Sequence, residues 1–174
     1  MYIYVVFLCI VFHLIPTQNF AINSNISDLK NSNYLLGQQF FLKGDFAKAL
    51  KQYERSLTYD PNHVASHYAI AKIHFLSKDS VSAFEFFRNT LSLKKNFKDA
   101  PALFNQTLTI IQANYDPNNK NPRQISAQIY LDFRSGRIEI AKRQIDRLVK
   151  SHPNFAMGWD HLANYYYRLK EPFQ

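Results

Sequence analysis

The sequence predicts an all-α fold, and three observations support this class. Only four of the 174 residues are glycine, which argues against turn-rich all-β folds and glycine-rich phosphate loops. No stretch shows the alternation of apolar and polar residues that is typical of strands. A set of small, aromatic and proline residues recurs every 34 residues, which is long enough for two helices and their turns.

The composition is that of a folded chain. Hydrophobic residues make up 47% and charged residues 20%, which is too apolar for a disordered segment. The formal net charge is +8, and Cys9 is the single cysteine. One cysteine excludes an intramolecular disulfide and a cysteine-based zinc cluster.

The apolar spacing predicts a series of helices in order along the chain. They span residues 31–43, 46–58, 64–77, 80–93, 99–114, 122–134, 137–150 and 156–169. Asp45 and Asp79 are expected to cap the helices that follow them, because aspartate accepts the free amides of a first turn. Asn121 is expected to cap the helix that Pro122 opens.

The repeat is defined by residues that recur at fixed shifts. The first copy is carried by Gly44, Asp45, Ala49, Tyr53 and Pro61. A shift of 34 residues places Asp79, Ala83 and Phe87 at the same positions. A shift of 92 residues does so for Gly136, Ala141, Ile145 and Pro153. A last copy opens with Trp159, Leu162, Ala163 and Tyr166.

These residues resemble the tetratricopeptide repeat, with its pattern W-x2-L-G-x2-Y, then A-x3-F, then P. The resemblance implies a right-handed solenoid of helical hairpins that is irregular in its middle. Small residues such as Gly37 and Ala71 would let two helices approach closely, and Tyr53 and Phe87 would fill the space between repeats. Proline after a second helix cannot continue it, so it ends the hairpin.

The spacing of the copies divides the chain into segments. Residues 30–97 hold two repeats, and residues 122–174 hold one more repeat and a C-terminal capping or truncated repeat helix. The segment 98–121 is a degenerate partial repeat with a loop, because the shift of 92 is ten residues short of three periods. Either the array continues irregularly through this segment, or two blocks, 30–114 and 122–174, are joined by a turn at 115–121.

The N-terminus resembles a targeting segment. Residues 1–15 are apolar except for His13, and no charged side chain precedes Asp28. Residues 1–21 are therefore predicted to be a secretory signal peptide, with export to a bacterial periplasm or cell surface. The alternatives are an N-terminal anchor, which would associate the chain with a membrane through residues 1–15, and a buried helix.

No catalytic motif is present, so the chain is predicted not to be an enzyme and to need no cofactor. His63, His67 and His74 can share a helical face, but no H-E-x-x-H pair or cysteine accompanies them, and no metal site is predicted. Asp132 and Glu139 lie on different predicted helices among basic residues. They are expected to be solvated or to form salt bridges.

The resemblance instead implies recognition of another protein. The first helices of such repeats line a concave groove, which would hold a peptide or helix of the partner. The groove residues carried over from the first two copies are Tyr34, Gln38, Phe41, Tyr68, Lys72 and Phe75. The later positions are Tyr130, Phe133, Asn164 and Tyr167. Where some relatives clamp a carboxylate with lysine and asparagine, this chain has Tyr34, Gln38, Ala65 and Ala69, which departs from that pattern.

The predicted function is an exported protein–protein interaction scaffold. The alternatives are a membrane-tethered assembly factor and a non-catalytic repeat subunit of a larger enzyme system. Residues 120–150 are strongly basic, and Arg143, Arg147 and Lys150 share one helical face. This face is either solvated or a docking surface for an acidic partner or an anionic lipid surface. No motif for binding nucleic acid is present.

Overall fold

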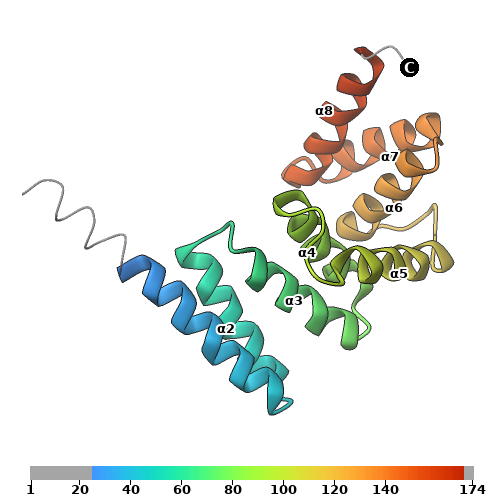
Figure 1. The fold of residues 1–174 in the computed structure, drawn as a ribbon. Coiled ribbons are helices and arrows are strands. Elements are labelled where there is room, and N and C mark those ends of the chain that lie inside the picture. Colours follow the sequence, from blue (N-terminus) through green and yellow to red (C-terminus); the bar gives the residue numbers. More distant parts are fainter. Residues whose placement is uncertain (1–24, 171–174) are drawn as a thin grey trace, which may run out of the picture. The chain divides into compact units, whose positions relative to one another are not determined.

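A computed structural model of the protein describes residues 25–170, and the described part consists of helices joined by short turns and loops, without strands (Figure 1). The first helix is described over residues 25–42. The others are α2 (Phe46–Tyr59), α3 (Val64–Leu76), α4 (Ser80–Leu93), α5 (Ala100–Ala113), α6 (Pro122–Arg134), α7 (Ile138–Ser151) and α8 (Ala156–Lys170). The all-α prediction is confirmed, and the bounds of α2 to α8 agree with it to within one residue. The predictions for residues 1–21 and Cys9 lie outside the described residues.

The described residues form two compact units, which are divided between Ile73 and His74. The division falls within α3 and not at the loop 115–121. Helices α5 and α6, on either side of that loop, pack against each other in the second unit.

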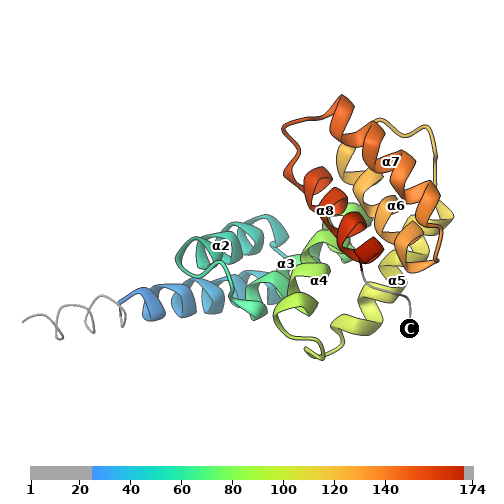
Figure 2. The same cartoon turned by 90° about the horizontal axis from the view of Figure 1, so that it is seen from above.

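The first unit is built on a hairpin of the helix 25–42 and α2, which lie side by side in both views (Figures 1 and 2). A Cβ atom on Gly37 would come within 2.6 Å of the ring of Tyr53, which is only 2% exposed. The missing side chain therefore lets the two helices approach, as predicted. The hairpin is also tied by the Ser56 hydroxyl, which donates to the Lys30 carbonyl at 2.9 Å, and by the Lys30–Asp60 ion pair at 2.8 Å.

The second unit contains α4 to α8. Helix α4 packs on α5, α6 packs on α7, and α7 packs on α8, while α6 also contacts α4, α5 and α8. The repeat positions form its core: Ala83, Phe87, Ala141 and Ile145 are fully buried. The burial of Phe87 agrees with the packing role predicted for it.

The turns within the hairpins repeat the same backbone geometry. Gly44, Lys78 and Gly136 occupy the same repeat position, and all have positive φ, at 75°, 62° and 73°. In each case the next amide donates to a carbonyl five residues earlier, for example Asp45 to Phe40 at 3.0 Å and Asp79 to His74 at 2.9 Å. Such bonds satisfy the free carbonyls at a helix end. Two of the three positions are glycine, the residue that adopts this conformation without steric cost.

The predicted N-caps are confirmed. The carboxylates of Asp45 and Asp79 accept the amides of Lys48 and Ser82, each at 3.1 Å. The Asn121 side chain accepts the amides of the residues that follow Pro122. The starts of these helices can therefore be predicted from the capping residue alone.

Candidate functional site

An open cavity of about 490 Å³ lies in the second unit, between α4, α6 and α8. We call it the arginine pocket. Helix α4 supplies Arg88, Asn89 and Ser92; α6 supplies Tyr130, Phe133 and Arg134; and α8 supplies Asp160, His161, Asn164 and Arg168.

Helical spacing brings these residues together. Side chains three or four residues apart lie on one face of a helix. This places Arg88 beside Ser92 on α4, and Asp160, Asn164 and Arg168 in one row along α8. The segment between α4 and α6 contains one long helix, α5, and α6 packs against both α4 and α5. The short middle segment is therefore what brings α4 and α6 to the same cavity.

Aromatic rings form the apolar wall of the pocket. The Tyr130 ring packs against Phe84 and Phe104, with centroid separations of 5.2 and 5.7 Å. Phe133 is 6% exposed, and the guanidinium carbon of Arg168 lies 5.2 Å from its ring centroid. Because the Arg168 Nε also donates to Asn164 Oδ1 at 3.0 Å, its planar group is held in a defined orientation.

His161 is a neutral member of the wall. Its Nε2 lies 2.7 Å from the Ser126 hydroxyl, and the side chain is buried. Burial and, secondarily, the positive charge of Arg88 lower the pKa of His161 to about 4. The imidazole is therefore uncharged near neutral pH, and the charged groups of the pocket are its arginines and Asp160.

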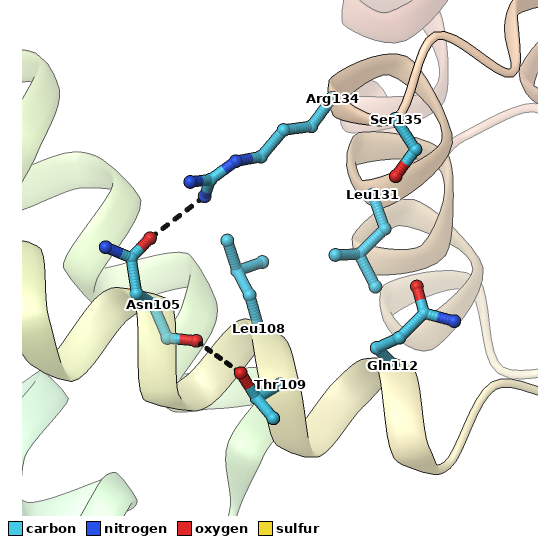
Figure 3. A pocket seen from close by; sticks show the side chains of 7 residues that line it. All are labelled: Asn105, Leu108, Thr109, Gln112, Leu131, Arg134 and Ser135. Carbon is cyan, nitrogen blue, oxygen red and sulfur yellow. Dashed lines mark hydrogen bonds between the residues drawn. The ribbon is translucent and has the colours of Figure 1, made fainter.

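A second, shallower cavity of about 460 Å³ lies between α5 and α6 (Figure 3). Its walls include Leu108 and Leu131, and the Arg134 side chain reaches across to donate to Asn105 Oδ1 at 3.0 Å. Arg134 borders both cavities. Its partner here is a neutral amide, so the bond leaves the arginine charge uncompensated.

The comparisons with known proteins bear on the helical repeat itself. A family model described as a TPR repeat, the tetratricopeptide repeat, matches residues 37–77. Residues 37–77 of the chain therefore match a tetratricopeptide repeat. This repeat is generally a non-catalytic protein-interaction fold.

Two solved structures are similar to this chain, each at 16% identity. One is the first TPR of Spaghetti (RPAP3) bound to an HSP90 peptide; the match covers 83% of this chain and 96% of that one, with a TM-score of 0.40. The other is pilF of Pseudomonas aeruginosa, covering 84% and 71%, with a TM-score of 0.43. No curated protein matches the chain.

The groove residues predicted in the first two tetratricopeptide copies are largely engaged with neighbours. Tyr34 packs against the rings of Tyr53 and His63, and its hydroxyl accepts from Gln38 at 3.1 Å. Phe41 packs on Phe46.

The remaining groove residues lie on α3. Tyr68 is only 7% exposed, and the Lys72 ammonium lies 5.6 Å from its ring centroid. Phe75 belongs to the second unit, where its ring contacts Phe87 edge-on. A groove formed by these residues stays a prediction. Tyr68 would contribute little accessible surface to it, because its side chain is buried.

The groove positions predicted for the later copies lie elsewhere. Tyr130, Phe133 and Asn164, three of the four later groove positions, line the arginine pocket. The fourth, Tyr167, is 64% exposed and does not line it. Sequence reasoning missed Arg88 because it considered only the first helix of each hairpin. The i, i+4 pair of Asn164 and Arg168 was a signal that could have pointed to α8.

The three residues of the predicted basic face differ in their surroundings. Arg147 donates through its two Nη atoms to the carbonyls of Pro117 and Asn119, at 2.6 and 3.3 Å, and so holds the loop between α5 and α6. Arg143 and Lys150 are exposed. A docking role for this face stays a prediction. Arg147 is already bonded to loop carbonyls of this chain.

The histidines considered as metal ligands have protein partners. His63 Nδ1 lies 2.8 Å from the Ser66 hydroxyl, His67 Nε2 lies 2.7 Å from the Pro61 carbonyl, and His74 Nδ1 lies 3.3 Å from Asp79. Within residues 25–170, no three histidine, cysteine, aspartate or glutamate side chains are grouped to hold a metal ion. In the same range, no helix has both the length and the apolar character of a membrane span.

Proposed function

We propose that this protein is a tetratricopeptide-type scaffold that binds a peptide segment of another protein in the arginine pocket. The observation that carries the proposal is the open cavity between three helices, about 490 Å³ in volume and lined by aromatic and polar side chains. Recognition sites usually combine apolar walls with a few polar groups that fix the orientation of the ligand.

The lining suits a peptide for two reasons. The rings of Tyr130 and Phe133 offer flat apolar surface to a side chain of the partner. The amides of Asn89 and Asn164 can donate to and accept from a peptide backbone. Tyr130 and Phe133 are already held in place by packing, so binding would not have to order these rings.

Blocking the pocket tests this function. Ser92 is exposed at the pocket wall, so Ser92→Trp should fill the cavity and leave the fold intact. Random twelve-residue peptides would be selected by display on the full chain. The selected peptides are expected to lose at least tenfold in affinity for Ser92→Trp, as measured by fluorescence anisotropy.

The matched control is Gln38→Trp, which blocks the groove predicted in the first unit. Affinity for the peptides should be retained in this variant. Loss in Gln38→Trp and retention in Ser92→Trp would place the site in the first unit. If no peptide is enriched over an unrelated helical protein, binding of linear peptides is contradicted.

We also propose that the chain is exported, on the basis of the uncharged apolar run at residues 1–15. The expected result is a mature protein that begins near residue 22 when the intact mass of the chain from its native host is determined. An intact mass that includes residues 1–15 would contradict cleavage, and a retained anchor would then be the alternative to test by membrane fractionation.

A further inference from the structure

The lining of the pocket contains three arginines and one carboxylate. Arg88, Arg134 and Arg168 come from α4, α6 and α8, and Asp160 is the acidic residue of the lining. A concave site lined by one sign of charge concentrates ligands of the opposite sign. The pocket therefore has an excess of positive charge within a small volume.

None of these arginines forms an ion pair with a carboxylate of residues 25–170. Arg134 and Arg168 donate to the side-chain oxygens of Asn105 and Asn164, which are neutral. In the same unit, Arg123 is paired with Glu85 and Arg137 with Asp132. The pocket arginines thus keep charges that the fold neutralises elsewhere.

The positive charge of Arg88 also affects His161 in the wall of the pocket. Arg88 contributes to the lowered pKa of His161, after burial, which is the larger cause. His161 consequently stays neutral near pH 7, and the positive charge of the pocket comes from its arginines.

Resting on the proposed function, we infer that the arginine pocket recognises an acidic segment of the partner through aspartate or glutamate side chains. The planar guanidinium matches a carboxylate with two parallel hydrogen bonds, which is stronger and more directional than a single bond. Arg168 lies over the ring of Phe133, and its Nε donates to Asn164. Both of its Nη groups are left to donate to a carboxylate of the partner.

The shape of the site favours a peptide over an anionic membrane. The arginines converge on a cavity between three helices rather than on one flat face. A single side chain can enter such a cavity, whereas a bilayer surface cannot follow it. The neighbouring rings of Tyr130 and Phe133 would pack on an apolar residue beside the acidic one.

Two peptide libraries test the inference. One contains aspartate and glutamate at random positions, and the other replaces them by asparagine and glutamine. Binders are expected from the acidic library, and their affinity should fall as salt is raised from 50 to 300 mM, since screening weakens charge pairs. Arg88→Gln should weaken the best acidic peptide by about tenfold or more, because hydrogen bonds to charged groups are the stronger class.

The matched control is Arg143→Gln, which removes the same charge from an exposed position outside the pocket. It should change the dissociation constant by less than about twofold, in line with the small contribution of a distant exposed charge. The Arg88 side chain forms no ion pair within residues 25–170, so its replacement should leave the helical signal and the melting temperature unchanged.

The outcomes separate this inference from the proposed function. Binders from the amide library that are lost in Ser92→Trp would overturn the acidic specificity and leave the pocket as the site. Equal loss in Arg88→Gln and Arg143→Gln would overturn it too, because only net charge would matter. Arg88-dependent binding to phosphatidylglycerol vesicles, without binders from either library, would overturn both and indicate a lipid-binding site.

Discussion

Replacing Phe87 by alanine should lower the free energy of unfolding of the second unit by about 3–5 kcal/mol. Phe87 is fully buried, and its ring packs edge-on against Phe75 with a centroid separation of 6.4 Å. Truncation loses the transfer free energy of the ring and leaves a cavity that the packed helices fill only in part. The change is measured by urea unfolding followed through the fluorescence of Trp159, which lies in the same unit.

Leu93→Ala is the matched control on the same helix. Leu93 is 39% exposed, so its truncation should cost less than about 1 kcal/mol. Equal losses in the two variants would contradict the assignment of Phe87 to the core of the second unit.

Replacing Asp132 by alanine should cost about 3 kcal/mol, although the side chain is small. Asp132 is fully buried, and its Oδ1 accepts from Arg137 at 2.7 Å. Its Oδ2 accepts from the Tyr115 hydroxyl at 3.1 Å and the Gln144 amide at 3.0 Å. Removing the carboxylate leaves these donors without their acceptor. Because the Arg137 side chain is 38% exposed and can be hydrated, the loss should lie at the low end for a buried pair.

Asp146→Ala tests the same chemistry at the surface. Asp146 accepts from Lys142 at 2.6 Å, but its side chain is 55% exposed. Exposed pairs contribute little because water and salt screen them. The unfolding midpoint of this variant should stay near that of the parent. A loss as large as that of Asp132→Ala would contradict the role given to burial.

The helices and their packing could be predicted because their signals are local. The close packing of the first hairpin follows from the residue types at Gly37, Ala49 and Tyr53. The starts of two helices follow from the capping residues Asp45 and Asp79. The left-handed turn at Lys78 could be inferred only from its alignment with Gly44 and Gly136, since lysine has no preference for positive φ.

The pocket was harder to predict because its parts are distant in sequence. The aromatic positions Tyr130 and Phe133 follow from the repeat pattern, but Arg88 lies on the second helix of an earlier hairpin. Its place beside α6 depends on the short middle segment and its single helix α5. Asp132 was expected to be solvated or in a salt bridge. It forms the bridge with Arg137 but is fully buried, which depends on the packing of α7 and the reach of Tyr115.

The central claim, that the second unit holds the partner peptide, is tested most directly by photo-crosslinking. A p-benzoylphenylalanine would replace Asn89 in one sample and Gln38 in another, and each would be irradiated with the display-selected peptide. The account predicts a peptide adduct from position 89 and none from position 38, mapped by mass spectrometry. An adduct from position 38 alone would contradict it and move the site to the first unit.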